Sequence, residues 1–261
     1  MWGSGEGANA LAREGTVMSA HQPVGRQGHG ARRAVAMAVV VGVAAWAVLM
    51  TGPVWAGTIK GHVRFTGPAT EQKTLPVTTD QYVCGKEKDA EDLVLSPDKG
   101  IRNAVVWLRS TPPGAKRETP SAPVSLDQKQ CAFTPRVIVV PVGATAEFLN
   151  SDRLLHNIHS QSKGNPNFNR TQPKGRTIPI TFSKPEIIRI DCDLHPWMRA
   201  WVVVAEHSFY VVTGASGEFA LGSLPPGPYT LNVWQETLGT VTKDVTLGEA
   251  DTSVVIEMGR R

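Results

Sequence analysis

The sequence predicts an all-β protein. Among its 261 residues, 25 Gly and 19 Pro stand against only 3 Tyr and 7 Phe, a balance that favours many turns over a helical bundle. No segment keeps a sustained helical period, whereas short alternating or β-branched runs recur between Gly, Pro and Asn. Because 41% of the residues are hydrophobic, the chain can bury a substantial core. These observations together predict β-sandwich architecture.

The first 56 residues differ from the rest and have the pattern of an export leader. Arg32 and Arg33 precede an apolar run over residues 34–50, which is followed by the helix breaker Pro53 and the small residue Ala56. This order of charge, apolar run and small residue predicts a signal peptide that is cleaved near Ala56. The mature protein is then expected in the periplasm or another extracytoplasmic space, with no membrane span.

Two alternatives for the leader stay open. The apolar run is close to the roughly 17 residues at which a transmembrane helix becomes possible, so the leader can also be kept as an anchor. Met18 is an alternative start to Met1, since the first 30 residues are rich in Gly and show no periodicity.

The charge and cysteine content of the mature chain limit the classes of function that the sequence supports. From Gly57 onward, 23 Lys and Arg face 21 Asp and Glu, a net charge of +2 that gives no argument for nucleic-acid binding. The three cysteines are Cys84, Cys131 and Cys192, and an odd count in an exported protein suggests one disulfide and one thiol with another role. Because Cys192 stands beside His and Met, we expect Cys84 to pair with Cys131; the alternative is two buried free thiols.

Three groups of predicted strands follow one another along the mature chain. TIKGHVRF and NAVVWL form the first, and a Pro-rich loop, STPPGAKRETPSAP, follows them. The second group and the third group are separated at about Ser208. The second comprises RVIVVPVGATAEFLN, TIPITF, EIIRID and AWVVVAE; the third comprises FYVVT, GEFAL, YTLNVW, TVTKDVTL and SVVIEM.

The stretch CDLHPWMRAW places Cys192, His195 and Met198 three residues apart. Such spacing would put the three side chains roughly on one face of a helix. Pro196 argues against a helix, because its ring removes an N–H group and disfavours the helical conformation of the residue before it. With β-branched runs on both sides, the stretch is predicted to be a loop between strands.

Copper gives a reason for this combination of side chains. Thiolate suits Cu(I), imidazole suits both oxidation states, and a thioether can tune the redox potential from an axial position. A copper site needs a second imidazole from elsewhere in the fold. His156 and His159, in the stretch DRLLHNIHS just after a predicted strand, are the candidates.

These two stretches resemble plastocyanin-like and amicyanin-like cupredoxins, the type 1 blue copper proteins. HNIH, followed by CDLHPWM, is similar to the amicyanin order, and the resemblance covers roughly residues 125–206. It implies a Greek-key sandwich with one mononuclear copper. The implied ligands are His156, Cys192, His195 and Met198. Asn157 would tie the His156 segment to the Cys192 loop as an outer hydrogen-bonding residue.

The other histidines and two tryptophans receive weaker assignments. His159 is expected to be a loop histidine, because the family pattern takes the His that precedes Asn. Trp197 either lies in an apolar surface patch through which electrons enter or packs in the core. Trp201 is expected to pack the sandwich, and His62 and His207 are expected to be structural.

A second resemblance concerns the ends of the mature chain. GEFALGSLPPGPYTLNVW is similar to the signature of carboxypeptidase-regulatory-like, transthyretin-like β-sandwiches, and GTIKGHVRF and NAVVWL resemble their first strands. We therefore expect residues 57–120 and 208–261 to form this sandwich, with a cupredoxin domain at 121–207 inserted or fused. The loop at 161–176 is expected to be a solvated connection.

The leading function hypothesis is an exported one-electron carrier that uses a single copper ion between redox partner proteins, such as c-type cytochromes or a periplasmic dehydrogenase. One alternative is copper delivery or storage. Another is a carbohydrate-binding or adhesion module in which the cupredoxin part is only a scaffold. We do not expect an enzyme, because the remaining histidines are too scattered for a second copper centre and no hydrolytic constellation stands out.

Overall fold

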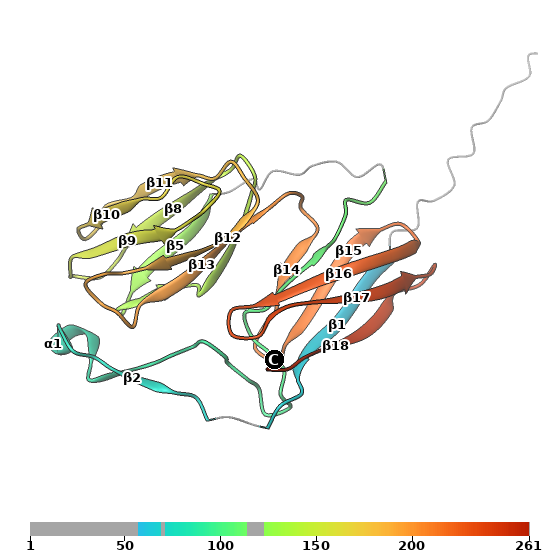
Figure 1. Cartoon of the computed structure of the whole chain (residues 1–261), viewed down its shortest axis with the longest axis horizontal. Coiled ribbons are helices and arrows are strands. Elements are labelled where there is room, and N and C mark those ends of the chain that lie inside the picture. Colours follow the sequence, from blue (N-terminus) through green and yellow to red (C-terminus); the bar gives the residue numbers. More distant parts are fainter. Residues whose placement is uncertain (1–56, 69–70, 114–122, 261) are drawn as a thin grey trace, which may run out of the picture. The chain divides into compact units, whose positions relative to one another are not determined.

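The computed structural model describes residues 57–68, 71–113 and 123–260. The leader expected at 1–56, with its cleavage site near Ala56, lies outside these ranges. Within them, the one helix is the single turn α1 (Gln81–Cys84), and the other regular elements are strands, so the prediction of an all-β protein is confirmed (Figure 1). No helix in the described ranges is long and apolar enough to cross a membrane.

The middle of the chain forms one sandwich, here called the inserted sandwich. One sheet has the order β10-β9-β12-β13-β7 and the other has the order β11-β8-β5-β6. Its strands are β5 (Val124–Lys129), β6 (Ala132–Thr134), β7 (Val137–Pro141), β8 (Thr145–Asn150), β9 (His156–Gln161), β10 (Asn169–Gln172), β11 (Ile178–Thr181), β12 (Glu186–Asp191) and β13 (Arg199–Ala205).

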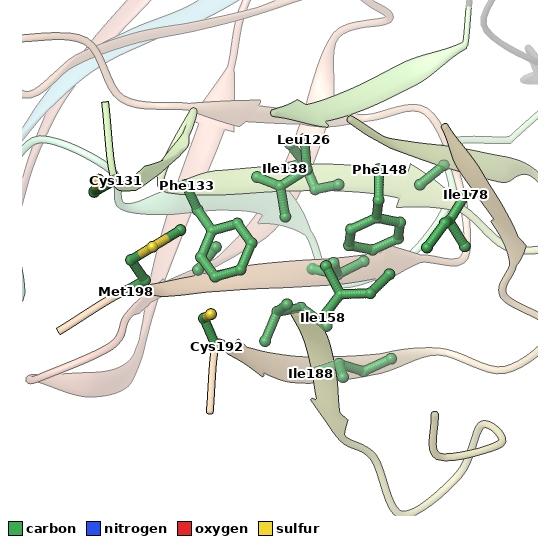
Figure 2. Packing of buried hydrophobic residues seen from close by; sticks show 14 of the residues in the cluster. Leu126, Cys131, Phe133, Ile138, Phe148, Ile158, Ile178, Ile188, Cys192 and Met198 are labelled. Carbon is green, nitrogen blue, oxygen red and sulfur yellow. The ribbon is translucent and has the colours of Figure 1, made fainter. Parts of the chain in front are cut away.

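Apolar side chains from both of these sheets fill the space between them. Leu126 and Phe148 come from one sheet and Ile158 and Ile188 from the other, and all four are fully buried in one cluster (Figure 2). Alternate residues of a strand point to opposite faces, so each strand contributes every second side chain to this core. Cys192 belongs to the same cluster, which places the free thiol in the apolar interior of the sandwich.

Strands from both ends of the described chain form a second sandwich, here called the terminal sandwich. Its sheets have the orders β15-β1-β18 and β14-β4-β16-β17. Strand β1 pairs antiparallel with β15 and parallel with β18, so strands from both ends of the described chain share one sheet. The boundaries at 120/121 and 207/208 stay a prediction. The strands are β1 (Gly57–Phe65), β4 (Val105–Leu108), β14 (Tyr210–Val212), β15 (Glu218–Leu224), β16 (Gly227–Gln235), β17 (Gly239–Leu247) and β18 (Thr252–Met258).

One segment departs from the predicted division of the chain. The ribbon of β2 (Thr74–Pro76) and β3 (Glu87–Asp89) flanks α1, and sequence analysis assigned all of 57–120 to the terminal sandwich. Instead, Val77 and Cys84 are buried in the core cluster of the inserted sandwich. This segment is held there covalently, because Cys84 forms a disulfide with Cys131 of the inserted sandwich. The disulfide also confirms the predicted cysteine pair.

Strand β7 is buried on both faces, which explains its unbroken apolar sequence VIVVP. Its side chains alternate between two clusters: Ile138 lies in the core of the inserted sandwich, whereas Val137 and Val139 lie in a separate cluster with Trp234 of β16. In that second cluster Trp201 meets Trp234 edge to face, with ring centroids 5.1 Å apart. Trp201 therefore packs between strands, as expected.

The loop at 161–176 is more ordered than a solvated connection. It contains β10, which pairs with β9, and a turn organised by one carboxylate. Glu186 accepts hydrogen bonds from the Ser162 hydroxyl at 2.6 Å and from the backbone N–H groups of Lys163, Gly164 and Asn165. Burial works to raise the pKa of Glu186, but these hydrogen bonds outweigh it and lower the pKa from 4.5 to about 2.

Because the pKa of Glu186 is lower in the folded state, its stabilising effect is present above pH 4.5 and is lost as the pH falls toward 2. We expect Glu186→Gln to reduce the free energy of unfolding by about 1–3 kcal/mol at pH 7, since several donors lose a charged acceptor. In urea titrations the difference from wild type should shrink at pH 3. Glu206→Gln, at an exposed position, serves as the control, and an equal difference at both pH values would contradict this account.

Candidate metal centre

Neighbouring strands bring the candidate metal ligands together. Strand β9 begins at His156, β12 ends immediately before Cys192, and β13 begins after Met198. The antiparallel register pairs Asp191 of β12 with His159 of β9. The residues that follow Asp191 therefore run beside the start of β9, where His156 lies.

The stretch at 192–198 is a loop between two paired strands, so the helix alternative is wrong. Two backbone hydrogen bonds close it: Met198 donates to the carbonyl of His195 at 2.8 Å, and Cys192 donates to the carbonyl of Met198 at 3.2 Å. As the sequence predicted, Pro196 is accommodated in a turn. The loop thus folds back on itself and directs several side chains into the sandwich.

His156, Cys192 and His195 converge as a group that fits a metal ion. The Nδ1 atoms of the two histidines are 2.9 Å apart. The Cys192 Sγ atom lies 3.9 Å from Nδ1 of His156 and 3.6 Å from Nδ1 of His195. All three side chains are buried, so the donor atoms face one another in a site closed to bulk water.

These three distances fit a bound ion. A triangle with these sides contains a point about 2 Å from every corner. Bonds from a d-block metal such as zinc to imidazole nitrogen and thiolate sulfur are about 2.0–2.3 Å long. The donor set therefore accommodates an ion after only small movements of the side chains.

Burial sets the protonation of the metal-free site. It raises the pKa of the Cys192 thiol, and it lowers the pKa of His156 although a hydrogen bond with Asp152 opposes this. A buried neutral thiol next to a neutral imidazole results. Metal binding must then displace the thiol proton, which couples loading to proton release.

Met198, the predicted fourth ligand, is fully buried in the same cluster as Cys192. Figure 2 shows both side chains at the same end of the core, near Phe133. The structure thus brings the thioether to the region of the site.

Asn157 connects the first strand of the site to the loop. Its Oδ1 atom accepts hydrogen bonds from the Cys192 thiol at 3.3 Å and from the backbone N–H of Asp193 at 2.8 Å. Its Nδ2 group donates to the carboxylate of Asp193 at 3.0 Å and to Asn169 at 2.8 Å. Asn157 therefore holds the sulfur and the loop backbone in one orientation.

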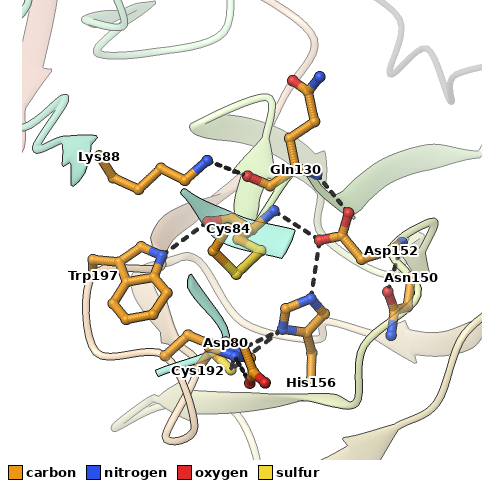
Figure 3. The surroundings of a disulfide bond; sticks show 11 residues. Asp80, Cys84, Lys88, Gln130, Asn150, Asp152, His156, Cys192 and Trp197 are labelled. Carbon is orange, nitrogen blue, oxygen red and sulfur yellow. Dashed lines mark hydrogen bonds and ion pairs between the residues drawn. A yellow bond between two sulfur atoms is a disulfide. The ribbon is translucent and has the colours of Figure 1, made fainter. Parts of the chain in front are cut away.

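Two carboxylates that the sequence did not point to lie on the far sides of the imidazole rings; Figure 3 shows the one at His156. Nε2 of His156 lies 3.0 Å from Oδ2 of Asp152, and Nε2 of His195 lies 3.0 Å from Oδ2 of Asp80. A carboxylate on the outer nitrogen selects the tautomer whose inner nitrogen is free to bind a metal. Asp152 is four residues before His156 and was visible in DRLLH, whereas Asp80 is 115 residues from its partner.

The other three histidines in the described ranges lie outside the group. His159 is partly exposed and pairs with Asp193 at 2.9 Å, His207 bonds the carbonyl of Leu108, and His62 approaches the carbonyl of Ser216. Their contacts are structural, and none of the three contributes a donor atom to the convergent site.

Trp197 does not form a surface patch. It is 8% exposed, its ring centroid is 5.2 Å from that of His195, and its Nε1–H donates to the carbonyl of Cys131. This position results from the closed loop, which turns the indole inward. The exposed apolar side chains include Leu155 and Leu194, which adjoin His156 and His195 in sequence, and Tyr82 and Val83 of α1.

Comparison with known families gives one match, to the carboxypeptidase regulatory-like domain over residues 194–258. This match begins within the ligand loop, upstream of the predicted boundary at 208. No curated protein matches the chain.

Several solved structures resemble parts of the chain at low TM-scores. A copper-containing nitrite reductase from Thermus scotoductus is 28% identical, with a TM-score of 0.32, and the match covers 39% of this chain and 26% of the reductase. A purple cupredoxin from Nitrosopumilus maritimus is 22% identical over 31% of this chain and 99% of its own, with a TM-score of 0.28. Amicyanin from Paracoccus versutus is 21% identical over 38% of this chain and 97% of its own, with a TM-score of 0.30.

The chain is therefore an all-β protein with a carboxypeptidase regulatory-like match near its end and a buried His-Cys-His group suited to a metal ion.

Proposed function

We propose that the protein holds one copper ion through His156, Cys192 and His195, with Met198 as a weak fourth ligand, and carries single electrons between redox partners. The observation that carries the proposal is the convergence of two imidazole Nδ1 atoms and one thiol on a common point about 2 Å away.

The donor chemistry favours copper over zinc. Structural zinc sites take four strong ligands, whereas this group offers three strong donors and a thioether nearby. Two histidines and one cysteine with a distant methionine are the donor set of copper electron-transfer sites. Copper, when bound, supplies a one-electron couple.

The protein holds the ligand side chains in fixed orientations. Asn157 fixes the backbone of the Cys192 loop through the N–H of Asp193, and Asp152 and Asp80 fix the outer nitrogens of His156 and His195. Because the ligand side chains are buried and hydrogen-bonded, little reorganises when the charge of the site changes.

The surroundings support exchange with a protein partner. In the described part of the chain, four of the five exposed large hydrophobic side chains are Leu155, Leu194, Tyr82 and Val83. The first two adjoin ligands, and the other two belong to α1. Partners of this kind include c-type cytochromes and periplasmic dehydrogenases, and the Cys84–Cys131 disulfide fits a protein that works outside the cytoplasm.

Voltammetry of the copper-loaded protein distinguishes electron transfer from copper delivery or storage. We expect a reversible one-electron wave with unchanged copper content over many cycles, because the ligands are buried and held. A protein that loses copper on each reduction, or that shows no reversible wave, would instead support delivery or storage.

A further inference from the structure

We propose that Asp80 and α1 form a cover over His195, anchored by the Cys84–Cys131 disulfide, that controls how readily metal leaves the site. The proposal rests on the proposed copper site, but the cover itself can be tested without metal.

The contact at the centre of the cover is the pair of Asp80 and His195. The imidazole is fully buried, whereas the Asp80 side chain is 32% exposed. Asp80 therefore lies between the ring and solvent. Its carboxylate would ordinarily cap the helix that follows, but it makes no capping bond and instead meets Nε2 of His195 at 3.0 Å.

The conformation of Asp80 supports this role. Its φ angle is 52°, in the left-handed region that a non-glycine residue seldom adopts. The backbone carbonyl of the same residue accepts the N–H groups of Val83 and Cys84, both at 2.9 Å. The strained turn thus directs the carboxylate toward the site while starting the helix that ends at Cys84.

The helix has little to hold it except the disulfide. A helix of four residues is not stable alone, and Cys84 is its one buried residue, while Tyr82 is 82% exposed. The Cys84–Cys131 bond therefore joins Asp80 to the inserted sandwich through five residues of chain.

The same disulfide is also connected, through hydrogen bonds, to His156. The backbone N–H of Cys131 donates to Oδ2 of Asp152 at 2.8 Å, and this oxygen also holds Nε2 of His156 (Figure 3). The carbonyl of Cys131 accepts the indole N–H of Trp197. Asp80 and Asp152, the carboxylates that contact the two imidazoles, are therefore both connected to the Cys84–Cys131 disulfide.

Reduction of the disulfide would release the cover. A dithiol donates two electrons and two protons, becomes a disulfide itself and leaves Cys84 and Cys131 as thiols. Asp80 then keeps its contact with His195, and its segment keeps the packing of Leu75 and Val77 and the hydrogen bond from Lys88 to the carbonyl of Gln130. These noncovalent contacts hold the segment less firmly than the cross-link does. His195 becomes accessible, and a metal ion can leave more rapidly.

The first test uses metal-free protein and the rate at which diethyl pyrocarbonate modifies His195, followed by peptide mass spectrometry. We expect slow modification in oxidised wild type and about tenfold faster modification in Asp80→Ala and in dithiothreitol-treated wild type. Asp80→Asn keeps an acceptor oxygen and should stay close to wild type. Asp98→Ala, at an exposed position, is the matched control.

The second test measures transfer of Cu(I) from the loaded variants to a colorimetric chelator. We expect copper to leave Asp80→Ala about 10- to 100-fold faster than it leaves any of the three comparison proteins, which are wild type, Asp80→Asn and Asp98→Ala. Equal rates for Asp80→Ala and wild type in either test would overturn the cover. A protein that binds no copper would overturn the proposed function instead, and the first test would still decide whether the cover exists.

Discussion

Replacing Cys192 with Ser is expected to abolish the intense visible absorption of the copper-loaded protein and to weaken copper binding by more than about 100-fold. In the proposed site the band would arise from charge transfer between thiolate and copper, whereas a serine hydroxyl remains protonated near neutral pH. The thiolate is also the one anionic donor in the His-Cys-His group, so no other ligand of the group offsets the charge of the ion.

The fold should tolerate this change, because serine is close in size and its hydroxyl can still donate to Oδ1 of Asn157. Optical titration with copper at matched protein concentration gives both the band and the affinity. His62→Gln, an exposed position on the terminal sandwich, is the control and should keep the band. Retention of the visible band in Cys192→Ser would show that the thiol is not a ligand.

Removing the disulfide is expected to reduce the free energy of unfolding of the metal-free protein by about 4 kcal/mol. The bond joins residues 47 apart in sequence, and the unfolded chain gains the entropy of that loop when the cross-link is absent. The double variant Cys84→Ser and Cys131→Ser, compared with wild type in urea titrations, measures the loss. Should the double variant not fold, wild type with and without dithiothreitol gives the same comparison.

Both forms of the experiment should agree, since each removes the same cross-link. A urea midpoint that does not change when the disulfide is reduced would contradict the view that α1 and its neighbours depend on this bond. Such a result would also weaken the proposed cover, because noncovalent contacts would then be enough to hold Asp80 in place.

Much of the site was predictable because its chemistry is local in sequence. Cys192, His195 and Met198 fall within one loop, and Pro196 between strand-like runs excludes a helix. The residues alone left His156 and His159 as candidates, and the resemblance to cupredoxins favoured His156, the histidine that precedes Asn. The disulfide could be predicted from an odd number of cysteines in a chain whose first residues have the pattern of an export leader.

The outer contacts of the site were not predictable from the sequence. Asp80 reaches His195 across 115 residues, and the disulfide and the packing of Val77 bring their segments together. The segment that carries Asp80 precedes NAVVWL, which belongs to the terminal sandwich. Order along the chain therefore suggested that this segment packs on the terminal sandwich, whereas it packs on the inserted one. Trp197 was ambiguous because an indole suits both a surface and a core, and here its N–H finds a buried carbonyl.

The most direct test of the account is X-ray absorption at the copper edge on wild type and Cys192→Ser, each loaded with one equivalent of copper. We predict two nitrogen ligands at about 2.0 Å and one sulfur at about 2.3 Å in wild type, with the short sulfur absent from the variant. A wild-type spectrum that contains only nitrogen and oxygen ligands would contradict a copper site at His156, Cys192 and His195.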